Sequence, residues 1–461
     1  MAIEIQGFRG QIIARGADGY EHARAIWNGA IDRRPAAIAR CIGTSDVVAA
    51  VRYARDHDLM VSVRGGGHNI AGLALVDDGL VIDLSLMRGV RTDPAGRTVR
   101  VQGGALLGDV DNDTQLYGLA VPSGVVTHTG VGGLTLGGGI GWLMRNHGLS
   151  IDNLLSADVV TADGSVQRAS EDEDPDLFWG IRGGGGNFGI VTSFEFRAAP
   201  VGPTVLGGPI YWPMEDGSEV LRFYRDFIDD SPLEYGSIIN LRRAPAVPFL
   251  PAELHGRPVV GIANCWIGDL DDGERFLEPL RRFGAPLIDL VTRKPWLAHQ
   301  SMFDVTVPHG WHYYWKSTEL PRLDDDMIDV IVSNSLKITS PLSYSVIFHL
   351  GGAVAAVPED ATAYSHRSVA HNININGVWL PDDPGAAEHT QWARRFFDEL
   401  APFQSGVYVN FLMEEGHDRV RAAYGEQKYA RLVSLKTRYD PDNLFRINQN
   451  IAPLAAGGND I

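Results

Sequence analysis

The sequence lacks the features that mark secreted, membrane-spanning or nucleic-acid-binding proteins. Its 461 residues include only two cysteines, Cys41 and Cys265, which are too far apart for a CxxC metal or redox pair. No apolar run approaches the roughly 18 residues of a membrane helix, and the first residues lack a signal peptide's basic and apolar segments. With 57 acidic against 40 basic residues, the formal charge of −17 disfavours nucleic acid and anionic membrane as partners. We therefore expect a cytoplasmic protein.

A metal site is not expected either. His309 and His312 form an H-x-x-H, but the sequence offers no third ligand of suitable type nearby and no HExxH context.

Glycine, in contrast, is abundant and gathers in three clusters, at 64–69 (RGGGHN), 130–141 (GVGGLTLGGGIG) and 182–189 (RGGGGNFG). The third contains a formal GxGxxG, but the alternating run Ile190–Arg197 predicts a strand where a Rossmann fold requires a helix. The second lacks the GK[ST] of a Walker loop. Because glycine lets backbone N–H groups approach a ligand closely, three such clusters favour a long ligand that carries phosphates.

The pattern of predicted elements changes near residue 200. Before it, strands are expected at 60–64, 79–86, 98–102 and 157–161, with a helix that starts at an N-cap, Ser45. After it, Trp311–Ser317 (WHYYWKS) and His371–Trp379 (HNININGVW) alternate with period two, as half-buried strands do. The last segment combines a strand-like VYVNFLM with a helix over 424–438.

Five motifs, in order, resemble one family. They are VSVRGGGHNIAG, VPSGVVTHTGVGGLTLGGGIGWL, IDNLLSADVVTADG, DLFWGIRGGGGNFGIVTSFEF and the pair YVNF with YDPDNLFRINQNI, and they extend from about Ile38 to Pro453. By these motifs the chain is similar to FAD-linked oxidases with a PCMH-type (vanillyl-alcohol oxidase-like) FAD-binding domain, in the berberine bridge enzyme-like branch. Its motifs also resemble those of bacterial members of the branch such as hydroxynicotine oxidase and the enterocin-type flavoenzymes.

The resemblance implies an α+β fold. An FAD-binding domain of two α/β subdomains would occupy residues 1–200, with its motif core at 36–197. A substrate domain, an antiparallel sheet backed by helices, would occupy 201–406, and the berberine-like segment 407–461 would complete the FAD domain.

The resemblance also implies that FAD is bonded to His68 through its 8α-methyl group, with a noncovalent contact of His68 as the alternative. Many relatives add a second bond from a cysteine, but Val126 stands at that position, so we expect one covalent bond. The cofactor contacts implied by motif position are His68, Arg64, Gly65, Gly66, Gly67, Asn69, Val126, His128, Thr129, Gly130, Gly132, Gly133, Leu134, Gly138, Gly141, Asn187, Gly189, Val191 and Asn448.

The residues expected to face the substrate depart from the family. Tyr408 and Asn410 alternate on one face of VYVNFLM, but Phe411 stands where relatives often carry a tyrosine base. The strand 371–379 offers three asparagines where relatives often carry Lys, Gln or Glu, and amides orient a substrate without deprotonating it. Tyr313, His312 and His128 are further candidates for a base. We predict Tyr408, Asn410, Asn374 and Tyr313 as catalytic, and Asn372, Asn376, Trp311 and Phe411 as pocket residues.

The resemblance thus implies an oxidase that transfers hydride from a C–H bond of a small, aromatic or largely apolar alcohol or amine to flavin N5, with O2 reduced to H2O2. Two alternatives stay open. His128, Thr129 and Leu134 resemble the O2 pocket of oxygenating members, which use an N5-oxygenated FAD. The substitutions at the substrate-facing positions also allow a flavin-binding protein without turnover. The expected partners are a small-molecule substrate and O2, without nucleic acid or membrane, and a homodimer is compatible with the sequence.

Overall fold

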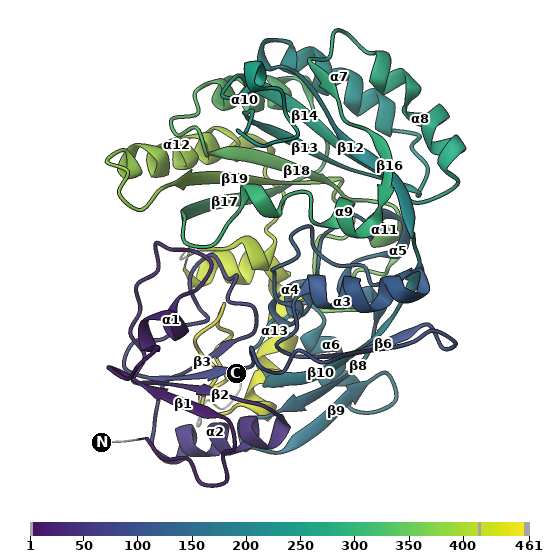
Figure 1. Cartoon of the computed structure of the whole chain (residues 1–461). Helices are drawn as coiled ribbons and strands as arrows, with labels where there is room; N and C mark the ends of the chain where they lie inside the picture. Colours follow the sequence, from purple (N-terminus) through teal and green to yellow (C-terminus); the bar gives the residue numbers. More distant parts are fainter. Residues whose placement is uncertain (1–2, 414–415, 456–461) are drawn as a thin grey trace.

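The computed structural model describes residues 3–413 and 416–455, and it has two lobes (Figure 1). The two-sheet lobe contains strands β1 to β10 and the C-terminal helix. The large-sheet lobe contains strands β12 to β19 and four long helices. The expectation of an α+β fold, with two small subdomains and a large antiparallel sheet backed by helices, is confirmed. No helix among the described residues is long and apolar enough to cross a membrane.

The two-sheet lobe holds a four-stranded and a five-stranded sheet. The first has the order β1 (Gln11–Ala14), β2 (Ala37–Arg40), β4 (Leu80–Asp83), β3 (Val61–Arg64), and β2, β4 and β3 are parallel. The second is antiparallel, with the order β5 (Val90–Asp93), β6 (Thr98–Gln102), β10 (Ile190–Arg197), β8 (Leu154–Val160), β9 (Val166–Ser170). The strands expected at 98–102 and 190–197 are therefore confirmed, and those expected at 60–64, 79–86 and 157–161 differ by a few residues at their ends.

One helix of this lobe starts differently from the expectation. α2 (Thr44–Asp56) has Gly43, not Ser45, as its N-cap residue. The Ser45 hydroxyl lies inside the first turn and accepts a hydrogen bond from the Arg9 guanidinium at 2.9 Å, so it is not available to cap the helix.

The large sheet has eight strands. Along it lie β15 (Ile288–Asp289), β12 (Thr204–Pro213), β14 (Pro258–Trp266), β13 (Tyr235–Arg243), β18 (Tyr344–His349), β19 (His371–Trp379) and β17 (His312–Leu320), and β16 (Thr292–Pro295) pairs with β12. Four helices cover its outer face (Figure 1): α7 (Gly217–Ile228), α8 (Leu270–Arg282), α10 (Asp325–Leu336) and α12 (Ala386–Glu399). The other face looks toward the two-sheet lobe.

The C-terminal segment returns to the two-sheet lobe, where α13 (His417–Tyr439) packs beside α6 (Pro175–Ile181). α13 starts earlier than the expected helix and is kinked at Gly425, whose φ of 70° is left-handed. The expectation that VYVNFLM forms a strand is wrong. A 3₁₀ turn, Val409–Phe411, follows Tyr408 directly, because the Phe411 N–H donates back to the Tyr408 carbonyl at 3.0 Å.

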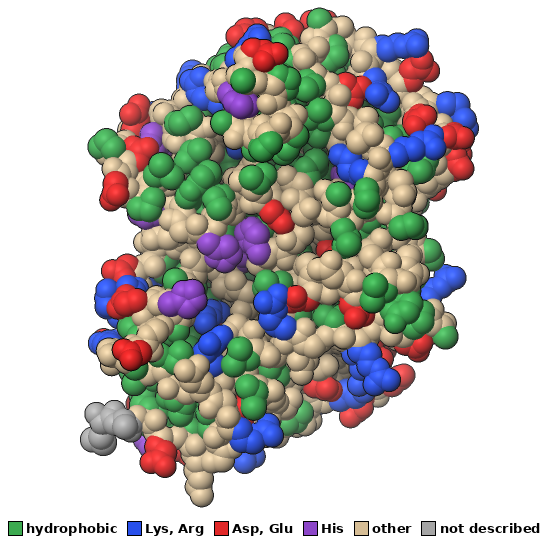
Figure 2. Space-filling model, viewed as in Figure 1, with side chains coloured by type: hydrophobic (Ala, Val, Ile, Leu, Met, Phe, Trp, Pro, Cys, Tyr) green, Lys and Arg blue, Asp and Glu red, His purple; other side chains and the backbone are tan. Residues whose placement is uncertain are grey.

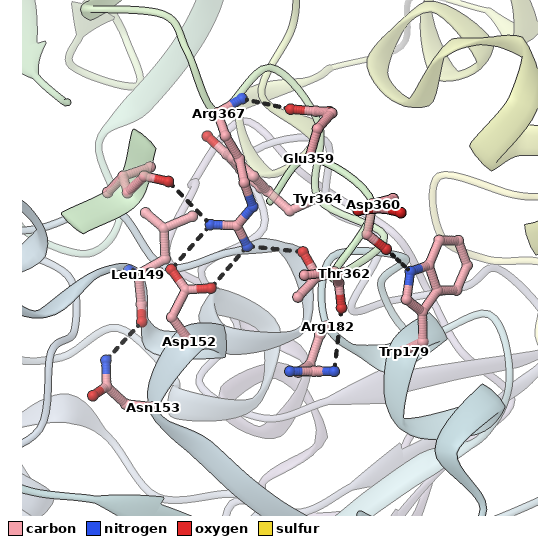
Figure 3. Close-up of polar contacts among 12 residues, drawn as sticks. Leu149, Asp152, Asn153, Trp179, Arg182, Glu359, Asp360, Thr362, Tyr364 and Arg367 are labelled. Atoms are coloured by element: carbon pink, nitrogen blue, oxygen red, sulfur yellow. Dashed lines mark hydrogen bonds and ion pairs between the residues drawn. The ribbon is translucent and has the colours of Figure 1, made fainter. Parts of the chain in front are cut away.

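A buried ion pair joins the two lobes (Figure 3). The Arg367 guanidinium, from the segment between β18 and β19, binds both carboxylate oxygens of Asp152 in the two-sheet lobe at 2.7 and 3.1 Å. It also donates to the Thr362 hydroxyl at 2.8 Å. Nearby, the Trp179 indole donates to the Asp360 carbonyl at 2.9 Å, so the segment is attached at two points. These contacts fix the large sheet above the glycine loops.

Candidate functional site

A cavity of about 360 Å³ lies between the lobes, with the glycine clusters on one side and the inner face of the large sheet on the other. All three clusters contribute to its wall, although they are far apart in sequence. The predicted residues that line it are Gly65, Gly66, Gly67, His68, Asn69, Val126, Thr129, Gly130, Gly132, Gly133, Leu134, Asn187, Gly189, Val191, Asn448, Tyr408, Asn410, Phe411, Asn374 and Asn376.

The glycines serve two distinct purposes. At Gly66 a Cβ atom would lie 2.4 Å from the Gly130 nitrogen, so the first two loops touch backbone to backbone and only glycine fits. At Gly133 and Gly186 a Cβ would meet nothing within 4 Å, because these backbones face the open cavity. A ligand can therefore lie directly against the backbone there.

The wall also carries polar atoms that no described protein group satisfies. The Oδ1 atoms of Asn240, Asn374 and Asn448 and the indole N–H of Trp315 are buried without a hydrogen-bond partner among the described residues. All four residues line the cavity. Because unsatisfied buried polar groups are rare in native proteins, these atoms indicate a polar ligand that extends from the glycine loops to the sheet. An FAD-sized group fits this distribution.

His68 lies at one end of the cavity. Its ring is stacked on Trp27 with centroids 4.6 Å apart, and Trp27 stacks in turn on Tyr313 at 3.8 Å. The His68 Nε2 lies 2.6 Å from the His128 Nδ1. Burial, with the neighbouring imidazoles of His128 and His309, lowers the pKa of His68 well below its usual value. The ring is therefore neutral at pH 7 and can act as a nucleophile or ligand.

His309 was missed as a neighbour of His68. The sequence pairs it with His312, but the structure brings it instead to His68 and His128, with the three ligand nitrogens within 4.8 Å of one another. On the face shown in Figure 2, histidine side chains gather near the waist between the lobes. Three neutral imidazoles also form a zinc ligand set. A metal ion held by these histidines would not provide hydrogen-bond partners for the unsatisfied polar atoms along the rest of the cavity, whereas a long ligand attached at His68 would.

Tyr408 and Asn410 meet in the cavity wall through the 3₁₀ turn. The Tyr408 hydroxyl accepts hydrogen bonds from the Gly139 N–H and the Asn410 amide, both at 2.9 Å. The same amide donates to the Leu134 carbonyl at 3.0 Å. Burial raises the pKa of Tyr408, so its phenol is neutral at pH 7. With two donors directed at its oxygen, the phenol proton is left to donate toward the cavity.

The inner face of the sheet supplies the opposite wall. Asn374 and Asn376 alternate along β19, and the strand register places Trp315, Asn376, Tyr344 and Arg242 in one row across four strands. All of these residues line the cavity. Arg242, Tyr344 and Trp315 were not among the predicted site residues; the inward alternation of WHYYWKS was the available signal for Trp315, and strand pairing supplied the rest.

Seven predicted residues do not line the cavity. The Tyr313 hydroxyl donates to the Pro308 carbonyl at 2.7 Å, and burial raises its pKa, so the structure does not support a role as base. The Arg64 guanidinium pairs with the buried Asp83. Asn372 accepts a hydrogen bond from Ser317 at 3.3 Å. His128 contacts His68 instead of the cavity. The remaining three pack against neighbouring protein atoms and not against the cavity; they are Trp311, Gly138 and Gly141.

Comparisons with known proteins agree with this architecture. An FAD binding domain family matches residues 35–170, and a berberine and berberine-like family matches residues 407–452. An FAD-linked oxidoreductase of Dictyostelium discoideum is 32% identical, covering 97% of this chain and 96% of that protein. The (R)-6-hydroxynicotine oxidase of Paenarthrobacter nicotinovorans is 33% identical over 96% and 97%. The crystal structure of 6-hydroxy-D-nicotine oxidase from Arthrobacter nicotinovorans superposes with a TM-score of 0.87 at 30% identity, covering 96% and 98%.

Proposed function

Because the chain belongs to the FAD-linked oxidoreductases with a berberine-like C-terminal domain, we propose that it oxidises a small amine or alcohol by removing hydride from a C–H bond, with O2 as the electron acceptor. The observation that carries the proposal is the cavity that connects His68, the glycine loops and the amides of the sheet. FAD bound there would supply a two-electron acceptor for the hydride, with O2 as the final acceptor and H2O2 as its product.

The chain's own residues bind and orient. His68 is the proposed covalent anchor, because its half-buried, neutral ring lines the cavity. The backbones at Gly133 and Gly186 accommodate the cofactor without a side chain in the way. Trp315, Phe411 and Val346 give the space above them an apolar wall, which excludes water and suits an aromatic or largely apolar substrate.

The balance of polar groups favours an amine over an alcohol. Among the described residues that line the cavity, the polar groups opposite the glycine loops are amides, the Thr306 hydroxyl, the neutral phenols of Tyr344 and Tyr408 and a guanidinium, and none of them is a base at pH 7. A neutral amine gives up hydride without a base, whereas an alcohol is helped by one. Asn374 and Asn410 orient the substrate.

Anaerobic mixing with a panel of amines and alcohols tests the proposal. We expect at least one amine to bleach the flavin absorption, and H2O2 to form in equal amount when air is admitted. Bleaching followed by an oxygenated product in place of peroxide would indicate oxygenase chemistry. No bleaching by any member of a broad panel would contradict the proposal and leave a flavin-binding protein without turnover.

A further inference from the structure

Arg242 presents a buried positive charge to the cavity. It lies on β13, only 5% of its surface is exposed, and its side chain is part of the cavity wall. The strand alternates so that Asn240 and Arg242 both face inward, while Arg243 belongs to the other face of the sheet.

The protein gives this guanidinium little compensation. Its Nε donates to the Arg243 carbonyl at 3.3 Å, and its Cζ lies 5.1 Å from the centre of the Tyr344 ring. No carboxylate among residues 3–413 and 416–455 forms an ion pair with it. Burial lowers the pKa of Arg242, and the phenols of Tyr211 and Tyr344, whose own pKa values burial raises, are neutral at pH 7.

The other buried arginines show how unusual this is. Arg64 pairs with Asp83, and Arg367 pairs with Asp152. Arg145, which has no carboxylate, donates instead to the carbonyls of Tyr235, Leu350 and Ser231. A buried charge without such partners is unfavourable, so we expect a ligand to supply the opposite charge.

We propose that Arg242 binds a carboxylate of the substrate, which makes the proposed oxidase specific for acids; this inference rests on the proposed function. The planar guanidinium matches a carboxylate with two parallel hydrogen bonds. Tyr344 and Asn240 line the cavity beside it, and a phenol O–H and an amide N–H are further donors that an anion can use.

The position of Arg242 also separates recognition from chemistry. β13 lies two strands from β19 across the sheet, or about 10 Å at the usual strand spacing. The carboxylate is therefore held at the end of the substrate away from the Asn374 amide. The acidic group fixes the substrate's orientation and takes no part in the oxidation.

Benzoate and its neutral analogue benzamide are the probes that test this. Each is titrated into the FAD-loaded protein, with flavin absorption and tryptophan fluorescence as readouts. We expect benzoate to bind at least about 10-fold more tightly than benzamide, since a hydrogen bond to a charged group is worth about 10-fold to 100-fold in affinity. Equal binding of the two probes to the unaltered protein would overturn the inference without any variant.

Variants locate the effect. Arg242→Met should remove the preference for benzoate and leave benzamide binding within about 2-fold. Arg243→Met, on the next residue but the opposite face of the strand, is the matched control and should change neither. Arg242→Lys keeps the positive charge but loses the planar pair of donors, and should retain part of the preference for benzoate over benzamide.

The outcomes separate this inference from the proposed function. If Arg242→Met alters the flavin spectrum or FAD content and leaves the benzoate preference intact, the guanidinium faces the cofactor and the inference is wrong. If benzoate binds as expected but no amine or alcohol, acidic or neutral, bleaches the flavin, the anion site stands and the proposed oxidation fails.

Discussion

Replacing Arg367 by methionine should destabilise the protein strongly, because it breaks the buried ion pair between the lobes (Figure 3). The Arg367 side chain is 2% exposed and that of Asp152 is 7% exposed. Removing the guanidinium leaves the carboxylate with only the Leu149 N–H, at 2.9 Å, among these contacts. Breaking a buried pair by removing one partner costs about 3–5 kcal/mol. With an unfolding entropy of about 2.1 cal/mol/K per residue, the 461-residue chain should lose about 3–5 °C in Tm.

Differential scanning calorimetry of the FAD-loaded protein measures this loss. The matched control is Arg431→Met, which breaks an ion pair with Asp176 whose side chains are 45% and 54% exposed. Exposed pairs contribute about 0–1 kcal/mol, so the control should shift Tm by about 1 °C or less. A second variant, Asp152→Asn with Arg367→Met, should recover part of the loss, since no buried charge is left unpaired. Equal shifts for Arg367→Met and Arg431→Met would show that the buried pair contributes no more to stability than the exposed one.

Three further predictions concern the cavity. Because burial lowers the pKa of His68, its ring stays neutral even at pH values somewhat below the usual histidine pKa of about 6.5. The rate at which added FAD becomes covalently attached to the apoprotein should therefore be constant from about pH 8 to about pH 6. A rate that falls with a midpoint near pH 6.5 would contradict the lowered pKa. Gly66→Ala should lower both the Tm of the apoprotein and its FAD content, because the new Cβ meets the Gly130 nitrogen. Gly133→Ala should lower the FAD content alone, because its Cβ would enter the open cavity. Equal losses of Tm in the two variants would be inconsistent with an open cavity at Gly133. Tyr408→Phe should reduce kcat/KM about 10-fold or more. The pH profile of kcat/KM between pH 7 and 9 should not change, since the phenol of Tyr408 is neutral in that range. If the variant loses an ionisation that the unaltered protein shows in that range, Tyr408 acts as a base.

The sequence predicted those elements in which apolar side chains recur at regular intervals along one segment. Ile190–Arg197 and His371–Trp379 alternate because each contributes to a sheet, and both strands have the expected bounds. The same alternation misled at Tyr408 and Asn410, since a single 3₁₀ turn also brings residues two apart into contact.

The parts of the site that the sequence did not indicate depend on long-range pairing. Arg242 faces the cavity because β13 pairs with β14 and β18, and an arginine near the end of one strand carries no sign of this by itself. His309 and Trp27 reach His68 from segments about 240 and 40 residues away. His309 comes from the segment before β17 in the large-sheet lobe and Trp27 from the segment between β1 and β2 in the two-sheet lobe, so no local pattern indicates either contact.

The most direct test of the central claim is an absorption spectrum of the denatured, washed protein. We expect flavin absorption to stay with the precipitated chain of the unaltered protein, and His68→Ala to release it to the supernatant. A colourless precipitate from the unaltered protein, or flavin that stays with the His68→Ala chain, would contradict the assignment of His68 as the covalent anchor of FAD.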